Sequence, residues 1–457
     1  MLTESIFRAY DIRGIVGQSL FVEGVYQIGQ ALGSECLARG DQSLLVARDG
    51  RLSGPEMAQA LIQGIRATGC HVIDIGQVPT PVLYFAAATH THTRSGVMIT
   101  GSHNPPDYNG FKIVLRGETL YGDQIRALYT RICQQDLTQG TGEYQTLDIR
   151  ETYLQDVCTR LQLERPLKVV LDSGNGVTGE LAPELFRRLG CEVIALHSEI
   201  DGRFPNHHPD PGKLENLQDL LEEVSRTQAD IGLAFDGDGD RVGIVTPQGE
   251  VIYPDRLLMM FADEVLAQVP HGLILYDVKC THRVKERVQA AGGQARMIPT
   301  GHSLVKAEMK RTQALLAGEM SGHIFFQENW YGFDDGLYAG ARFLRLLAAS
   351  DQDADTLIST YPQDPSTPEI NVTVTEDNKF ALIERLAAQG DFTGGDVTLI
   401  DGVRVDYEDA WGLCRASNTT PMLVLRFEGK TPEALARVQA HFRQQLAQLD
   451  ASLTLNF

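Results

Sequence analysis

Short apolar runs, each long enough for one buried strand, recur along the first 360 or so residues and alternate with stretches of helical periodicity. The first set predicts strands at 44–47, 69–75 and 97–99 and a helix over about 55–66. Strands that alternate with helices form βαβ units, so this set predicts a largely parallel sheet covered by helices.

The same set recurs twice, which indicates an internal repeat. In the second copy we expect strands at 169–172, 190–194 and 231–235 and a helix that ends at Leu189. In the third copy we expect strands at 273–277, 292–298 and 314–317 and a helix at 283–290. In each copy the last strand runs into a glycine-rich polar loop. Chance similarity between αβ sequences is the alternative, but it does not explain three matching loops. We therefore predict three similar αβα domains.

The pattern changes after about residue 361, where Pro365 and Pro368 mark a linker. Beyond it, hairpin-like spacing predicts a small α+β domain. Its expected strands are 372–374, 397–400, 403–405 and 422–427, and its expected helices are 379–388 and 432–449. The predicted fold is three αβα domains with mixed, largely parallel sheets plus this C-terminal domain, around a central cleft. The predicted domains are 1–147, 148–250, 251–361 and 362–457.

Composition narrows the class of protein. The 457 residues are 43% hydrophobic and 22% charged, as in an ordinary soluble protein of several domains. The net charge of −20 argues against a nucleic-acid partner, and a phosphate substrate would need a local basic pocket. No apolar stretch reaches membrane-spanning length, the N-terminus lacks a basic signal region, and the seven cysteines are scattered. We expect a cytoplasmic protein with reduced cysteines and no membrane partner.

The segment 100–106 places Ser102 between a glycine and His103, directly after a predicted strand. Pro105 and Pro106 prevent a regular helix or strand, so the serine would sit on a stiff turn. Open α/β sheets bind their ligands at such strand ends. A surface turn explains the same composition, and this segment alone favours neither reading.

Asp236, Asp238 and Asp240 alternate with glycines, which allows the backbone to curl until the carboxylates converge on one cation. An EF-hand is excluded because its sixth and twelfth positions hold Arg241 and Pro247. A haloacid-dehalogenase-type nucleophile loop is disfavoured because Gly239 stands where Thr or Val is expected. Mg²⁺ fits better than a merely solubilising turn, which leaves the spacing unexplained.

Two further loops offer groups that bind sugars and phosphates. The loop 318–323 carries a carboxylate, a hydroxyl and an imidazole, on Glu319, Ser321 and His323. The loop 415–421 carries a guanidinium and several polar side chains, on Arg415, Ser417, Asn418 and Thr419. A helix cap and a proline-closed polar turn are the respective alternatives.

Five segments in this order, 7–14, 100–112, 236–241, 318–323 and 415–421, make the chain resemble the α-D-phosphohexomutase superfamily over essentially its whole length. The match is to its bacterial phosphomannomutase/phosphoglucomutase branch. The resemblance implies reversible interconversion of hexose 1-phosphate and hexose 6-phosphate, for mannose and glucose. Ser102 would be the phosphoserine, and hexose 1,6-bisphosphate the bound intermediate and activator. Mg²⁺ would be held by Asp236, Asp238, Asp240 and a phosphate oxygen on Ser102.

The resemblance also implies roles for further residues. His103 would assist at the serine, Lys112 and Arg241 would neutralise charge, and His323 and Lys112 would be the candidates for proton transfer. The groups that contact the substrate would be Tyr10, Arg13, Lys279, His302, Glu319, Ser321, His323, Arg415, Ser417, Asn418 and Thr419. The four domains would supply, in order, the phosphoserine, the metal ligands, the sugar contacts and the phosphate contacts.

Alternatives within and outside the superfamily differ in specific loops. Phosphoglucosamine mutases typically have Arg-Pro-Ser-Gly-Thr where this chain has Arg-Ala-Ser-Asn-Thr at 415–419. Glucose-only phosphoglucomutases tend to have Gly-Glu-Glu-Ser-Ala at 318–322, where this chain has Gly-Glu-Met-Ser-Gly. A Mg²⁺-dependent sugar phosphatase and a non-catalytic sugar-phosphate binding protein are the rival functions. Phosphosugars are the expected partners, and we expect a monomer.

Overall fold

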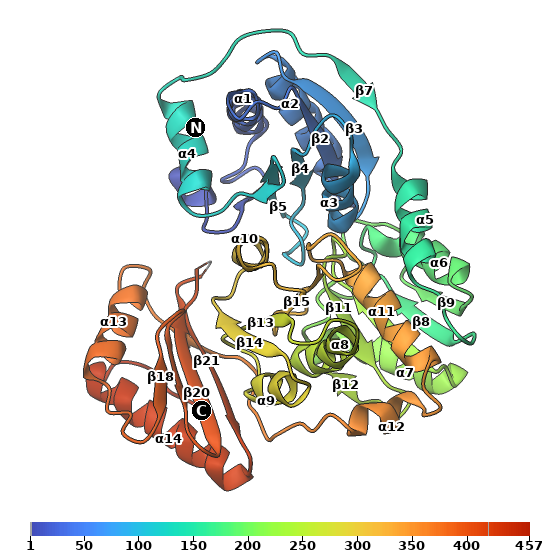
Figure 1. The fold of residues 1–457 in the computed structure, drawn as a ribbon. Helices are drawn as coiled ribbons and strands as arrows, with labels where there is room; N and C mark the ends of the chain where they lie inside the picture. The colour runs from blue at the N-terminus through green and yellow to red at the C-terminus, as the bar shows by residue number, and fades with distance from the viewer. Residues whose placement is uncertain (1, 419) are drawn as a thin grey trace.

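The computed structural model describes residues 2–418 and 420–457 and contains four sheets that follow one another along the chain (Figure 1). The first sheet has the order β1-β5-β4-β2-β3-β7, with β6 beside β5. Its strands are Ile12–Ile15 (β1), Ser43–Arg48 (β2), His71–Gln77 (β3), Gly96–Ile99 (β4), Tyr108–Leu115 (β5), Glu118–Thr119 (β6) and Tyr144–Thr146 (β7). Its helices are Glu4–Ile6 (η1), Val22–Ala38 (α1), Gly54–Arg66 (α2), Thr80–Thr89 (α3) and Asp123–Cys133 (α4).

The second and third sheets have the orders β12-β11-β10-β8-β9 and β14-β13-β15-β16. The second domain comprises Arg150–Arg160 (α5), Lys168–Asp172 (β8), Thr178–Arg188 (α6), Glu192–Leu196 (β9), Leu214–Leu217 (η2), Gln218–Thr227 (α7), Ile231–Phe235 (β10), Val242–Val245 (β11) and Val251–Ile252 (β12). The third comprises Pro254–Gln268 (α8), Leu273–Asp277 (β13), Arg283–Ala290 (α9), Gln294–Ile298 (β14), His302–Thr312 (α10), Leu316–Gly318 (β15), Ile324–Phe326 (β16), Gly336–Ala348 (α11) and Ala354–Ser359 (α12).

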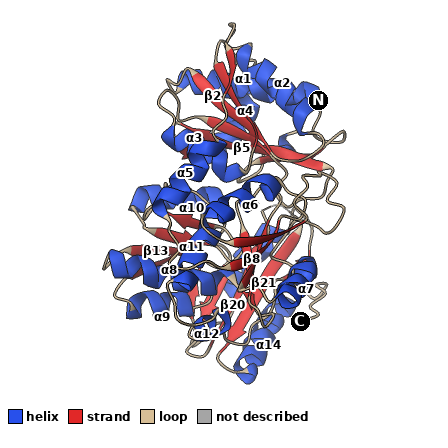
Figure 2. Cartoon of the chain, turned by 90° about the vertical axis from the view of Figure 1, so that its right-hand side faces the viewer, coloured by secondary structure: helices blue, strands red, loops and turns tan. Residues whose placement is uncertain are grey.

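The fourth sheet, β17-β21-β20-β19-β18, is antiparallel throughout. It is built from Ile370–Thr373 (β17), Lys379–Gln389 (α13), Asp396–Thr398 (β18), Val403–Asp406 (β19), Ala410–Ala416 (β20), Met422–Gly429 (β21) and Pro432–Leu449 (α14). In Figure 2, helices in blue cover the faces of the red sheets. None of the helices among the described residues has the length and apolar character that a membrane crossing requires.

The first three sheets share one plan, which confirms the predicted repeat. In each, two parallel strands flank the first strand of the set, and a fourth strand pairs antiparallel with the third. The sets are β2-β3-β4-β5, β8-β9-β10-β11 and β13-β14-β15-β16. The predicted fold of three αβα domains and a C-terminal α+β domain is therefore correct.

Some elements differ from the sequence prediction. Residues 108–112, to which the sequence analysis assigned no element, belong to strand β5, which begins shortly after the two prolines. The sequence analysis missed strand β20. Gly412 and Arg415 interrupt its apolar pattern, and the strand is buried because it lies between two domains. The expected strands near 190–194 and 314–317 begin two residues later.

The first three domains share a continuous core around Trp330. Its indole stacks on Tyr338 with centroids 4.2 Å apart and on Phe85 of α3 at 5.9 Å. The C-terminal domain, orange and red in Figure 1, attaches to the third domain. Arg404 donates to the carbonyls of Val278 and Cys280, both at 2.7 Å. These contacts fix how the strand ends of the four sheets meet.

Asp335 is a buried carboxyl that links the third domain to α5. It caps α11 by accepting from the Tyr338 amide at 2.9 Å, and it accepts from the Tyr153 hydroxyl at 2.9 Å. Burial outweighs these hydrogen bonds and raises the pKa of Asp335 to about 7.

The raised pKa makes stability depend on pH. The folded carboxyl binds its proton more tightly than the unfolded one, so Asp335 stabilises the fold increasingly as pH falls from about 8 toward about 5. In Asp335→Asn the amide oxygen keeps the cap, and this contribution disappears. We expect the apparent melting temperature of wild type minus that of the variant to rise as pH falls. Parallel pH profiles, as expected for the exposed control Asp351→Asn, would contradict this assignment.

Candidate active site

Ser102 lies in the loop that connects β4 to the antiparallel β5, and it is 3% exposed. Its φ of 49° places it in the left-handed region, and its amide donates to Oγ1 of Thr100 at 2.8 Å. The fully buried guanidinium of Arg51 donates to three main-chain carbonyls of this loop and to that of the first residue of β5: Ser102 (2.9 Å), Asn104 (2.6 Å), Pro105 (2.5 Å) and Tyr108 (2.9 Å). The predicted stiff turn is therefore present, held by one charged side chain.

The aspartate loop occupies the equivalent place in the second domain, between β10 and the antiparallel β11. Asp236, Asp238 and Asp240 are all fully buried. A Cβ on Gly237 would lie 2.5 Å from the carbonyl oxygen of Ser102, so only glycine permits this approach of the two loops. Oγ of Ser102 donates to Oδ2 of Asp236 at 3.1 Å.

The three carboxylates fit a divalent cation. One oxygen of each lies within 4.8 Å of the others. Oδ1 of Asp238 and Oδ1 of Asp240 are buried without a hydrogen-bond donor among the described residues. Buried acceptors of this kind are costly unless an ion or a donor satisfies them. An all-oxygen donor set suits Mg²⁺.

Two cations from the protein balance part of this charge. Nζ of Lys112 lies 2.7 Å from Oδ2 of Asp238 and 2.5 Å from Oδ2 of Asp240. Burial opposes the charge on Lys112, but the two carboxylates raise its pKa well above its ordinary value. Nε of Arg241 donates to Oδ2 of Asp236 at 3.2 Å. Burial and the other two aspartates raise the pKa of Asp236 to about 7.

Histidines lie on both sides of the serine and aspartate loops. Nδ1 of His103 is 3.1 Å from Oγ of Ser102, and burial together with Arg241 and Arg13 holds its pKa well below the ordinary value. Nδ1 of His323 lies 3.6 Å from Oδ1 of Asp240.

The His323 imidazole is stacked on His302, with ring centroids 5.6 Å apart, and its Nδ1 lies 3.1 Å from Oδ2 of Asp334. Burial opposes protonation of His323, but Asp240 and Asp334 raise its pKa. Lys306 donates to Nδ1 of His302 at 3.1 Å, and burial and Lys306 hold the pKa of His302 well below the ordinary value.

The loop after β15 brings the third domain to the same place. Glu319 is 2% exposed and accepts from the Gly301 amide at 2.6 Å. The main-chain carbonyl of Ser321 accepts from Arg241 at 3.3 Å. Nζ of Lys279 lies 2.7 Å from Oε1 of Glu369, in the segment that leads into the C-terminal domain.

The side chain of Asn418 connects the C-terminal domain to the first domain. Nδ2 of Asn418 donates to the hydroxyl of Tyr10 at 2.5 Å, and that hydroxyl donates to the carbonyl of Thr300 at 2.9 Å. Nε of Arg415 donates to Asp401 at 3.1 Å. Oγ of Ser417 accepts from the Thr420 amide at 3.2 Å. Thr419 lies outside the described residues.

Arg13 completes the ring of contacts around the serine loop. Its guanidinium donates to Oδ1 of Asn104 and to Oδ2 of Asp11, both at 2.5 Å. The structure therefore brings the serine, aspartate and third-domain loops together, with the Arg415 loop joined to them through Tyr10.

Several residues of this site were missed by the sequence analysis. Asp49 accepts from Oγ1 of Thr100 at 2.7 Å, and Thr80 donates to Oδ2 of Asp238 at 2.6 Å. Asp49 and Arg51 directly follow β2, the strand beside β4, so their position at a strand end was an available signal. Asp334 and Thr80 had no such signal, because only tertiary contacts place them here.

Known proteins match the whole chain. Family models described as phosphoglucomutase/phosphomannomutase match in order: α/β/α domain I at residues 4–139, domain II at 151–249, domain III at 253–364 and the C-terminal domain at 369–445. A phosphomannomutase/phosphoglucomutase of Pseudomonas aeruginosa is 57% identical over 456 residues, which cover 100% of this chain and 98% of that protein. A phosphoglucomutase of Neisseria gonorrhoeae is 49% identical, with 97% and 96% covered.

Solved structures agree with these matches. A phosphoglucomutase/phosphomannomutase family protein from Burkholderia thailandensis has a TM-score of 0.96 at 51% identity, with 100% of both chains covered. An N-acetylphosphoglucosamine mutase of Aspergillus fumigatus, at 14% identity and a TM-score of 0.61, shares the fold alone.

The four hydrogen bonds from Arg51 generate a prediction. In Arg51→Lys a single ammonium cannot reach four carbonyls, and each buried acceptor left without a donor costs about 1–3 kcal/mol. We expect a lower apparent melting temperature and a turnover at least about tenfold lower, since small misplacements of reacting groups are costly. The control Arg126→Lys, on the surface of α4, should match wild type. If Arg51→Lys also matches wild type in both measurements, Arg51 does not hold the serine loop.

Proposed function

Because the chain belongs to the phosphoglucomutase/phosphomannomutase family and is a hexose-phosphate mutase, we propose that it interconverts the 1- and 6-phosphates of mannose and glucose through phosphoserine at Ser102. The observation that carries this proposal is the position of Oγ of Ser102, 3.1 Å from Asp236 in a cluster of three buried aspartates. A hydroxyl at a cation site is suited to carry a phosphoryl group.

The proposed reaction conserves phosphate. The bond between phosphorus and Oγ of Ser102 breaks as a hydroxyl oxygen of the hexose monophosphate bonds to that phosphorus, and the hydroxyl proton passes to a basic side chain. The resulting hexose 1,6-bisphosphate turns end for end and returns its other phosphoryl group to Oγ. The departing oxygen regains a proton, and the isomeric monophosphate leaves.

The positions of the charged groups support their proposed roles. Asp236, Asp238 and Asp240, with a phosphate oxygen on Ser102, would hold Mg²⁺, which supplies charge neutralisation for the transferring group. Lys112 and Arg241 add positive charge in the same place. Our first candidate for proton transfer is His323, which lies beside Asp240, and the second is Lys112. His103 would orient the serine.

Substrate recognition is assigned to the other loops. Glu319 and Ser321 would bind sugar hydroxyls, and Lys279 and His302 would flank the sugar phosphate. Tyr10 and Arg13 would line the transfer site from the first domain. Arg415, Ser417, Asn418 and Thr419 would bind the phosphate that does not react. All these residues belong to one chain, which supports the proposal of an active monomer; its cytoplasmic location stays a prediction from the sequence.

Ser102→Ala tests the reaction directly. Wild type, supplied with a trace of glucose 1,6-bisphosphate, should convert glucose 1-phosphate or mannose 1-phosphate to the 6-phosphate without release of inorganic phosphate. The variant lacks the acceptor oxygen, so its turnover should fall by about 10³-fold or more. Ser359→Ala, an exposed serine on α12, is the control. Release of inorganic phosphate as the main product would support a phosphatase instead, and full activity of Ser102→Ala would reject the phosphoserine.

Removal of metal tests the carboxylate cluster. After dialysis against a chelator, turnover should drop to background, because the buried carboxylates then repel the incoming phosphate. Added Mg²⁺ should restore turnover in wild type, whereas Asp238→Asn should stay at least about a hundredfold lower. Circular dichroism should show that both proteins remain folded. Undiminished turnover in the chelated enzyme would exclude a metal requirement.

A further inference from the structure

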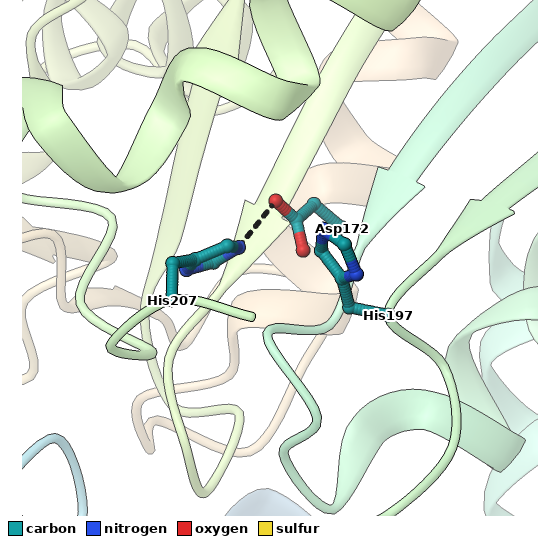
Figure 3. Close-up of side chains that lie close together, drawn as sticks. All are labelled: Asp172, His197 and His207. Atoms are coloured by element: carbon teal, nitrogen blue, oxygen red, sulfur yellow. Dashed lines mark hydrogen bonds and ion pairs between the residues drawn. The ribbon is translucent and has the colours of Figure 1, made fainter. Parts of the chain in front are cut away.

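A second set of side chains of the types that ligate metals lies at the carboxyl edge of the second sheet. Figure 3 shows Asp172, His197 and His207 facing one another from three segments of the chain. One oxygen of Asp172 and one nitrogen of each imidazole lie within 4.8 Å of one another. None of these residues has a part in the mutase reaction proposed above.

The fold places two of the three groups on rigid strand ends. Asp172 is the last residue of β8, and His197 directly follows β9. These strands are parallel neighbours, with Asp172 in register with Leu196, so their carboxyl ends project the two side chains side by side. His207 comes from the long connection between β9 and η2 and approaches them from the loop side (Figure 3).

Each of the three groups is held by a second partner. Oδ1 of Asp172 accepts from the Gly174 amide at 2.9 Å, while its Oδ2 lies 2.9 Å from Nε2 of His207. Nδ1 of His207 donates to the His208 carbonyl at 3.0 Å. Nε2 of His197 lies 2.8 Å from Oδ2 of Asp219 on α7. Metal-binding histidines are oriented in this way, with one ring nitrogen on a carboxylate or carbonyl and the other left for the ion.

Burial also suits an ion site with limited access to water. The side chain of Asp172 is 0% exposed, and those of His207 and His197 are 15% and 17% exposed. Two imidazoles and one carboxylate form a mixed nitrogen and oxygen donor set. Such a set favours Zn²⁺ over Mg²⁺ and Ca²⁺, which prefer oxygen alone.

We propose that Asp172, His197 and His207 bind one Zn²⁺ ion, separate from the Mg²⁺ of the aspartate loop. The ion takes the place of the proton between Nε2 of His207 and Oδ2 of Asp172, and that proton leaves to solvent. Asp219 orients the His197 ring, and water completes the tetrahedral coordination.

The ion would fix a loop that continues into the active site. Two residues after His207, Pro209 packs near Gly237, where a Cβ would lie 3.4 Å from its Cγ. The next residue, Asp210, accepts from Arg241 at 3.3 Å. Zn²⁺ at the strand ends thus stabilises the segment whose Asp210 accepts a hydrogen bond from Arg241. The role of the site is therefore structural.

The test uses the full-length enzyme, stripped of metal and then equilibrated with ZnCl₂ in the presence of excess Mg²⁺. Elemental analysis after gel filtration should find one zinc per wild-type chain, and zinc should raise the apparent melting temperature. His197→Asn should lose the bound zinc and the stabilisation. His271→Asn is the matched control, because His271 is exposed and both histidines have a positive φ that asparagine tolerates.

A second variant and direct localisation of the ion keep the test valid if the first variant misfolds. If His197→Asn fails to fold, His207→Gln supplies the same measurement, with zinc affinity expected to fall at least about tenfold. Anomalous diffraction at the zinc edge should place the ion between Asp172 and His207. Equal zinc content in wild type and in the folded variants, or an anomalous peak only at Asp236–Asp240, would overturn the proposal.

Discussion

The structure depends on the burial of three carboxylates in one loop. Asp236, Asp238 and Asp240 have no exposed surface, and burying a charge without partners is among the costliest acts in folding. From its own domain, the second, the loop receives the positive charge of Arg241. Lys112 comes from β5 of the first domain and His323 from the third, so the loop is stable only where three domains meet. Two of its oxygens still face no donor among the described residues, so the cluster keeps acceptors that suit a cation.

The internal repeat explains how such a meeting arises. The serine loop, the aspartate loop and the Glu319 loop each connect the third strand of their set to the antiparallel fourth. The same connection therefore carries, under the proposed function, the nucleophile, the cation site and the sugar contact in three successive domains. The C-terminal domain has another topology. Its Arg404 contacts the third domain, and the hydrogen bond from Asn418 to Tyr10 connects it to the first.

The sequence predicted the fold and the main loops because their signals are local. Apolar runs marked the buried strands, and prolines and glycines marked the turns, so the αβα repeat and the superfamily resemblance are both confirmed. Thr80 and Asp334 could not be recognised, because each acts through a contact with a segment distant in sequence. Strand β20 was not predicted for the same reason. Trp411 is buried against a neighbouring domain, and no periodic pattern in its own segment indicates this burial.

An acidic chain with a net charge of −20 can still accept a phosphosugar, because its cations are held in place individually. Arg13, Lys279 and Arg415 are each paired with one carboxylate, on Asp11, Glu369 and Asp401. Without these partners Lys279 and Arg415 would repel each other, and the side chains of all three cations would be free to turn away. Each pair also leaves donors unused, because a guanidinium has five N–H groups and an ammonium three. A phosphate can therefore join the pair without displacing the carboxylate, and it does not have to compete with the charge of the whole protein.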